Sequence, residues 1–192
     1  MARGKAKGRA KATLRRARAS KDAIALLKAD HRQVEQWFAQ FDKARDDSRK
    51  QELAIRLCQA LKVHTTIEEE IFYPAFIAAT EDRDLHHEAI VEHDGAKKLI
   101  AEIEAAGPDD DFFDARVTVL SEMIKHHVKE EEQPGGMFAE ARKADMDLAV
   151  LGEQLAARKA ELEGELGAAS GDMSPAARRG RNGGARSGAT RH

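Results

Sequence analysis

The sequence predicts an all-α protein: an up-down-up-down four-helix bundle with an additional C-terminal helix and a disordered basic tail at each end. Apolar residues recur at spacings of three and four, as on the buried face of a helix, and clusters with the alternating polarity of strands do not occur. Only four prolines interrupt the 192 residues. A hydrophobic content of 42% supports one core of about 120 to 150 residues, so we expect a single folded domain.

The charge of the chain is distributed unevenly, with basic ends around an acidic middle. Residues 1–22 hold nine Lys and Arg and residues 171–192 hold five Arg, and each segment has one Asp. Residues 23–170 hold 18 basic and 32 acidic side chains, a net charge of −14. Both ends lack the large apolar side chains that would offset the entropy of ordering them. The predicted organisation is a disordered tail (1–19), a bundle (20–136), a C-terminal helix (137–168) and a second disordered tail (169–192).

Two helices are predicted in the first part of the bundle. Ser20 is a suitable N-cap for the first helix. Its apolar stripe contains Ile24, Leu27, His31, Val34, Phe38 and Phe41. Ser48 and Gln51 form a capping box for a second helix, which we expect to end after Pro74. Its inner side carries Leu57, Leu61, His64, Glu68, Ile71 and Phe72.

A third and a fourth helix follow in the same way. Thr80 can cap the third helix, and Gly107 and Pro108 end it. Its inner side carries Leu85, Ala89, His93, Ala96, Ile100 and Ile103. Asp110 or Asp111 can cap the fourth helix, which ends before the Pro-Gly-Gly sequence at 134–136. Its inner side carries Val117, Leu120, Met123, Ile124, His127, Val128 and Glu131. Short connections make neighbouring helices antiparallel, which gives the bundle.

A fifth helix is expected near residues 138–166. It is rich in Glu, Lys and Ala, and its apolar side carries Leu148, Leu151, Leu155 and Leu162. This helix can pack on the bundle or pair with a second subunit. The sequence leaves both arrangements, and with them a dimer, open.

The two halves of the bundle repeat one set of polar residues within their apolar stripes. In each helical hairpin a His is followed 33 or 34 residues later by a second His, and a Glu stands four residues after that. The set consists of His31, His64, Glu68, His93, His127 and Glu131. Burying four imidazoles and two carboxylates together without a cation would combine several desolvation costs, so we expect them to bind metal.

The types of side chain in this set indicate which metals it suits. A His and a Glu four residues apart share a helix face, so the imidazole can hold one ion while the carboxylate reaches toward two. Imidazole and carboxylate without thiolate suit iron, manganese or zinc, whereas magnesium and calcium prefer oxygen ligands only. Six protein ligands on two ions leave coordination positions for water, hydroxide or dioxygen, and open positions are typical of reactive sites.

Other features of the chain exclude several classes of protein. The single Cys58 excludes an internal disulfide framework and a thiolate zinc cage. No apolar run approaches the ~18 residues of a membrane span, and no N-terminal segment resembles a secretory signal. We therefore expect a soluble, cytoplasmic protein without a membrane partner.

Four segments contain the candidate ligands in order: DHRQVEQWF, HTTIEEEIFYPAF, EAIVEHDGAKKLI and HHVKEEE. Together they resemble the hemerythrin-like HHE cation-binding domain family over about residues 22–145. This resemblance implies a four-helix bundle with two iron ions, in an oxo- or hydroxo-bridged non-haem di-iron centre. The implied metal ligands are the six residues of the repeated set.

The sequence departs from the dioxygen-carrying hemerythrins in its third and fourth helices. Their third helix has His-xxx-His, whereas the residues four positions before and after His93 are Ala89 and Lys97. Four histidines instead of five make reversible oxygen carriage a poor expectation. After the fourth helix, QPGG replaces the continuous turn that usually leads to an aromatic-Pro pair.

Residues beside the repeated set are expected to have supporting or solvated positions. His127 is favoured over His126 because apolar residues precede it by three, four and seven positions. A solvated or supporting position is expected for His86 and His87. The neighbouring glutamates mostly indicate a solvated helix face, although Glu69 or Glu132 could accept a hydrogen bond from a ligand His. The remaining aromatic residues, including Tyr73, are interpreted as core packing, with Tyr73 also a candidate near the site.

Three kinds of function fit these observations. The first is a hemerythrin-like di-iron protein that binds, senses or scavenges dioxygen, peroxide, nitric oxide or iron, in oxygen binding or oxidative stress. The second is a ferritin-like ferroxidase or peroxide-handling oxidase, whose sites have more carboxylates than histidines. The third is a structural or nucleoid-associated bundle whose basic tails contact nucleic acid through phosphates. Four His against two Glu favour the first function, and whether the protein turns over a substrate stays open.

Overall fold

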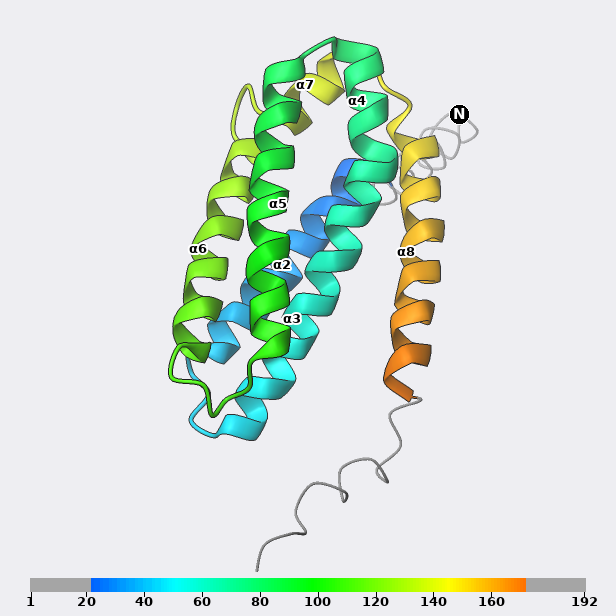
Figure 1. Cartoon of the computed structure of the whole chain (residues 1–192). Coiled ribbons are helices and arrows are strands. Elements are labelled where there is room, and N and C mark those ends of the chain that lie inside the picture. The colour runs from blue at the N-terminus through cyan, green and yellow to red at the C-terminus, as the bar shows by residue number, and fades with distance from the viewer. Residues whose placement is uncertain (1–21, 172–192) are drawn as a thin grey trace, which may run out of the picture.

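The computed structural model describes residues 22–171, and within that range it contains helices and no strand. Four antiparallel helices form an up-down-up-down bundle, which confirms the predicted fold class: α2 (Ala23–Phe41), α3 (Asp47–Ile67), α5 (Arg83–Ala105) and α6 (Phe113–Glu132) (Figure 1). None of the described helices is long and apolar enough to cross a membrane. Ser20 and the two predicted basic tails lie outside the described residues, apart from the first residues of the C-terminal one.

Aspartates, and not the predicted Ser and Thr residues, cap three of the bundle helices. Asp22 accepts a hydrogen bond from the Ala25 N–H, Asp46 from Arg49 and Asp82 from Leu85. Asp and Ser are nearly equivalent as N-caps. The prediction of Ser48 as the cap was therefore wrong, because Asp46, an equally good cap two positions earlier, begins the helix. The predicted cap Thr80 ends the preceding helix, where its hydroxyl donates to the Phe76 carbonyl.

The fourth helix begins without a side-chain cap. Phe112 occupies the N-cap position, so neither Asp110 nor Asp111 caps the helix as predicted. Asp110 instead stabilises the turn before it, accepting hydrogen bonds from the Phe112 N–H and from Arg116.

The second helix does not end after Pro74, contrary to the prediction. It passes into a π-helical segment, η1 (Glu68–Phe72), and continues as α4 (Tyr73–Thr80). The Tyr73 N–H donates to the carbonyl of Glu68, five residues back. Pro74 lies in the first turn of α4, directly after this wider turn. The chain therefore continues through η1 and passes Pro74 without a break.

The single C-terminal helix predicted near 138–166 is two helices. The short α7 (Met137–Lys143) crosses the end of the bundle, and the long α8 (Leu148–Gly171) runs down its side next to α2 and α3 (Figure 1). Asp145, with φ of 55°, lies in the turn between them. The apolar side of α8 packs on the bundle, and Leu155 is completely buried there.

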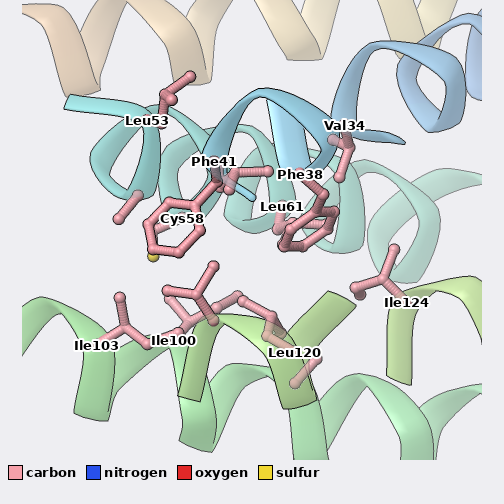
Figure 2. Packing of buried hydrophobic residues seen from close by; sticks show 14 of the residues in the cluster. Val34, Phe38, Phe41, Leu53, Cys58, Leu61, Ile100, Ile103, Leu120 and Ile124 are labelled. Atoms are coloured by element: carbon pink, nitrogen blue, oxygen red, sulfur yellow. The ribbon is translucent and has the colours of Figure 1, made fainter. Parts of the chain in front are cut away.

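The core consists of two apolar clusters at different heights along the bundle. Figure 2 shows one of them, in which Phe38, Phe41 and Leu61 meet Ile100 and Leu120 from the opposite hairpin. The other cluster lies toward α4 and α7. It includes Ile24, Leu27, Ile67, Phe72, Tyr73, Phe76, Met137, Phe138 and Leu155. The repeated polar residues of the sequence lie in the layer between these clusters.

Candidate metal centre

All six residues of the repeated set come together in one buried cluster. They are His31 (α2), His64 (α3), Glu68 (η1), His93 (α5), and His127 and Glu131 (α6). None of them is more than 5% exposed, although each is polar. The helical spacing that put them on apolar stripes therefore puts them in one interior site.

The four imidazoles face one another in two pairs, one within each hairpin. The Nε2 atoms of His31 and His64 are 3.0 Å apart, and those of His93 and His127 are 3.3 Å apart. Two nitrogens that bind one ion at a right angle, each about 2.1 Å from it, are about 3.0 Å apart. Each pair is thus spaced as two ligands of one ion would be.

The two carboxylates lie between the histidine pairs. Glu68 Oε2 is 3.3 Å from His64 Nε2 and 3.4 Å from His93 Nε2. Glu131 Oε2 is 3.5 Å from His31 Nε2 and 3.7 Å from His127 Nε2. Each Glu therefore reaches one member of both pairs, as a carboxylate bridging two ions must.

Each histidine has a carboxylate on its outer side. The Nδ1 atoms of His31, His93 and His127 are hydrogen-bonded at 2.8 to 2.9 Å. The respective acceptors are Glu132, Glu69 and Glu92. His64 Nδ1 has the longer contact of 3.6 Å with Asp30. Carboxylates in this position fix the orientation and tautomer of metal-binding imidazoles.

These outer carboxylates follow the same repeat as the inner residues. Asp30 and Glu92 each precede the first His of a hairpin and face its second His. Glu69 and Glu132 each follow the inner Glu of their own hairpin and face the first His of the other hairpin. The sequence indicated Glu69 and Glu132 as candidates but not Asp30 and Glu92. The signal that could have found them is the acidic residue before each of His31 and His93.

The tautomers imposed by the outer carboxylates leave lone pairs facing each other. A neutral imidazole that donates from Nδ1 has no proton on Nε2. The His93 and His127 Nε2 atoms then meet at 3.3 Å with nothing to donate, unless a cation or an extra proton lies between them. In addition, both oxygens of Glu68 and Oε2 of Glu131 are buried without a hydrogen-bond partner. The residues therefore fit a bound cation, and the donor atoms of His31, His64 and Glu68, and of Glu68, His93 and His127, form two groups able to hold a metal.

The pKa values of the two inner carboxylates are shifted in opposite directions. Burial and the negative charge of Glu68 raise the pKa of Glu131 to about 8. Burial also opposes ionisation of Glu68, but the charge of His64 and the interaction with His93 outweigh it and lower its pKa to about 2. For His127, burial is outweighed by the charge of Glu131 and the hydrogen bond to Glu92, which raise its pKa to about 9. The site thus retains protons that a metal would displace.

Aromatic residues make the two halves of the site unequal. The Tyr73 hydroxyl donates to Glu131 Oε1 at 3.2 Å and lies 3.2 Å from His93 Nε2. Burial and the nearby charge of Glu68 raise the pKa of Tyr73 well above its ordinary value, so its phenol stays protonated. Phe138 of α7 stacks on His31, with ring centroids 5.8 Å apart. The equivalent of Tyr73 in the second hairpin, five residues after the inner Glu, is Gly136.

The π-helical segment explains why Tyr73 reaches the site. In a regular α-helix, a residue five positions after Glu68 would point about 140° away from it. The wider turn of η1 brings both Glu68 and Tyr73 to the buried side, where each is 0% exposed. Such segments are frequent at functional sites, and no pattern in the sequence signals this one.

The remaining candidates lie outside the cluster. His126 is on the surface, with its side chain 61% exposed, whereas His127 points inward. His86 contacts the edge of the Tyr73 ring, and His87 is exposed. Lys97 forms an ion pair with Glu69 at 2.6 Å, and Ala89 is buried. Neither residue four positions from His93 thus supplies a fifth imidazole.

A small apolar cavity adjoins the four histidines. It measures about 10 Å³, and its walls include Val34, Leu61, Ile124 and Val128 beside the imidazoles. A volume of this size holds about one water molecule.

Comparisons with known proteins identify the fold and the family of the chain. A solved structure with a TM-score of 0.62 is the Hemerythrin HHE cation binding domain-containing protein of Mycobacterium kansasii, an Rv2633c homolog. It is 25% identical, and the match covers 75% of this chain and 88% of that one. A protein of Nostoc sp. described as a DNA nickase is 28% identical over 120 residues, or 61% of this chain; the match spans about a third (32%) of that longer relative. Residues 22–134, more than half of the chain, match the Hemerythrin HHE cation binding domain family. The chain therefore belongs to the hemerythrin HHE cation-binding domain family.

Proposed function

We propose that the site holds two iron ions, one between His31 and His64 and the other between His93 and His127, with Glu68 and Glu131 bridging them. The observation that supports this most strongly is the pairing of Nε2 atoms at 3.0 and 3.3 Å while the outer carboxylates hold the Nδ1 protons. Manganese or zinc would suit the same donor atoms. Iron is preferred because it adds redox chemistry to a site with a small adjoining cavity.

The proposed activity is the binding, sensing or scavenging of a small oxidant: dioxygen, peroxide or nitric oxide. A bound ferrous pair supplies two electrons to dioxygen or peroxide. The cavity of about 10 Å³ beside the four histidines leaves room for a group about the size of a water molecule next to the metal ligands. Its apolar walls exclude bulk water from the reacting ligand.

Tyr73 is the residue placed to supply a proton. Its hydroxyl touches Glu131 and His93, and its raised pKa keeps it protonated at neutral pH. Reduction of peroxide to water consumes two protons, and Tyr73 can relay one of them through its hydroxyl, taking up a proton as it gives one because its raised pKa disfavours the phenolate. The ring itself is held by burial and by the edge contact with His86.

The number of histidines favours irreversible oxidation over oxygen carriage. With Lys97 engaged by Glu69 and Ala89 in place of a ligand, the iron pair has four imidazoles. We expect air to convert the reduced protein to a stable ferric form, and peroxide and nitric oxide to react readily. The ratio of four His to two Glu also separates this site from ferritin-like ferroxidase sites, where carboxylates predominate.

The test is iron reconstitution under anaerobic conditions, with metal analysis and absorption spectra before and after air, peroxide and nitric oxide. We expect close to two iron ions per chain, and fewer in His64→Ala than in the control His87→Ala, which removes an exposed imidazole. Tyr73→Phe should retain its iron but react more slowly with peroxide. At most one ion per chain in the unaltered protein would contradict the proposal. Oxygen uptake that reverses on deoxygenation through repeated cycles would instead support oxygen storage.

A second candidate function is contact with nucleic acid through the basic ends. Residues 1–22 carry nine Lys and Arg, and a relative of this chain is described as a DNA nickase. The acidic middle of the chain, with its charge of −14, should repel phosphate. We expect the full chain to bind DNA in a salt-sensitive manner, and a variant spanning residues 20–170 to keep its metal but lose that binding. Incubation with supercoiled plasmid tests nicking in the same samples.

A further inference from the structure

A second group of metal-binding side chains lies on the surface beside the buried site. His126 Nε2 on α6 is 3.5 Å from Glu92 Oε1 on α5 and 3.3 Å from Glu130 Oε1. The donor atoms of these three residues lie within 4.8 Å of one another. None of the three belongs to the six buried residues. We call Glu92, His126 and Glu130 the outer trio.

The repeat shows that the outer trio is particular to one hairpin. Its members directly precede His93, His127 and Glu131, and the equivalent residues of the first hairpin directly precede His31, His64 and Glu68. These equivalents are Asp30, Val63 and Ile67. Val63 and Ile67 are buried in the apolar cluster that also contains Leu155 of α8, and Lys159 of α8 pairs with Asp30. One side of the site is thus covered by α8, and the matching side carries metal-binding groups in contact with solvent.

The charges around the outer carboxylates differ in the same way. Lys97 pairs with Glu69, and Lys159 with Asp30. Lys28 and Arg32 both pair with Glu132. Within residues 22–168, no Lys or Arg forms an ion pair with Glu92, which faces His126 and His127. The trio therefore combines two carboxylates with an imidazole at the one outer carboxylate that lacks a permanent cation.

A small hollow lies between two residues of the outer trio and two residues of the buried site. It measures about 10 Å³ and is lined by Glu92 and Glu130 together with the inner residues His127 and Glu131. Ala89 forms part of its wall, together with Leu85 and Met137. Glu131 Oε2 is buried without a hydrogen-bond partner at the inner end. An ion held by the trio would thus lie next to an inner carboxylate with an unused oxygen.

We propose that Glu92, His126 and Glu130 form an outer cation site that captures a divalent transition metal and passes it through the hollow to His127 and Glu131. A donor set of one imidazole and two carboxylates suits Fe²⁺, Mn²⁺, Co²⁺ or Zn²⁺ better than Mg²⁺ or Ca²⁺. Capture at the trio stands by itself, whereas passage inward rests on the proposed function of the six buried residues. Glu92 links the two sites because its other oxygen holds His127 in place.

The experiment adds Co²⁺ to the metal-free full-length protein and follows binding by calorimetry and by stopped-flow absorption. The test variant is His126→Ala/Glu130→Gln, which leaves Glu92 and all six inner residues intact. The matched control is His87→Ala/Glu122→Gln, which removes an exposed imidazole from α5 and an exposed carboxylate from α6. We expect the unaltered protein and the control to bind one weak ion beyond the tight ones. The test variant should lose this ion and fill its tight sites about tenfold more slowly at limiting Co²⁺, with the same final occupancy.

A further variant separates this proposal from the function proposed above. Glu68→Gln/Glu131→Gln removes the inner carboxylates, so tight binding should fall while the weak ion at the trio persists. If the unaltered protein binds no tight ion, the function proposed for the inner site fails, and the weak ion alone then decides whether the trio captures metal. A weak ion that survives His126→Ala/Glu130→Gln would overturn the outer site. Its loss with unchanged loading kinetics would overturn the passage inward.

Discussion

At the scale of single residues, the carboxylates behind the histidines decide what the site can bind. Glu132, Glu69 and Glu92 accept hydrogen bonds from Nδ1 and so keep the Nε2 lone pairs directed at the interior. Lysine and arginine side chains compensate most of these carboxylates on the solvent side. These outer carboxylates therefore orient the histidine ligands. Their lysine and arginine partners keep the outer surface of the site from being uniformly negative.

Replacing one of these carboxylates should weaken metal binding. In Glu69→Gln, His93 loses a charged acceptor and Lys97 loses its partner. We expect the affinity for the metal to fall by about 10- to 100-fold, measured by competition with a chromophoric chelator. Glu70→Gln is the matched control, because Glu70 is half-exposed and pairs with Arg158 at the surface. Equal affinities of the two variants would mean that Glu69 does not position His93.

The pKa of His127 predicts a pH dependence. In the metal-free protein, Glu131 and Glu92 raise this pKa to about 9, above the ordinary value of about 6.5. Stability from protonated His127 is therefore fully present below about pH 6.5 and is lost as the pH rises through about 9. Because a metal must displace this proton, affinity should increase between pH 7 and pH 9. Calorimetry in buffers of different ionisation enthalpy should show proton release at pH 7, and the absence of release would contradict this account.

At the scale of elements, the turn after α6 places α7 over the site. Gly135 has a φ of 84°, and a Cβ added to Gly136 would lie 2.0 Å from the Glu130 carbonyl oxygen and 2.9 Å from that of Glu131. The turn therefore needs glycine at both positions. Through it, Phe138 of α7 is brought onto the His31 ring.

Gly136→Ala should consequently disturb both stability and metal content. The added methyl group must displace the backbone that carries Glu131, so we expect a loss of about 1 to 3 kcal/mol in unfolding free energy and reduced iron per chain. Denaturant unfolding and metal analysis measure the two effects. Gly164→Ala in α8 is the control, since nothing lies within 4 Å of its added Cβ and alanine favours helix. A Gly136→Ala protein with unaltered stability would show that the turn relaxes freely.

The sequence predicted the inner part of this site better than its surroundings. The bundle and the convergence of His31, His64 and Glu68 follow from 3.6-residue periodicity, which a sequence displays directly. The link between Glu92 and His127 joins two helices, so no local pattern reports it. The π-helical turn at Glu68 was not predictable from local sequence, because it is stabilised by the burial of Tyr73 in the folded structure. Three helix starts were displaced by two residues because neighbouring Asp, Ser and Thr residues can all cap a helix, and the fourth helix starts without a side-chain cap.

At the scale of the whole molecule, the site joins the two hairpins. Glu132 of the second hairpin holds His31 of the first, and Glu69 of the first holds His93 of the second. The inner carboxylates cross between the pairs in the same way. A bound metal should therefore stabilise the bundle as a unit.

Removal of the metal should lower the melting temperature. Six buried polar side chains lose their common partner when the metal leaves. A ligand at about 100 times its Kd raises the free energy of unfolding by about 2.7 kcal/mol. For a chain of this length we expect a decrease of about 5 to 10 °C on chelation. Scanning calorimetry with and without chelator measures it, and His64→Ala should respond less. An unchanged melting temperature would indicate that the bundle is equally stable without metal.

The small cavity against the histidines has a consequence for selectivity among oxidants. Val34, Leu61, Ile124 and Val128 leave about 10 Å³, and close-packed helices cannot widen it cheaply. Such a space leaves room for little more than a water-sized group, so an organic hydroperoxide would have to place its alkyl group where the core is already filled. The protein should therefore discriminate by the bulk of the group attached to the O–O bond. Peroxidised lipids would be excluded even where they outnumber hydrogen peroxide.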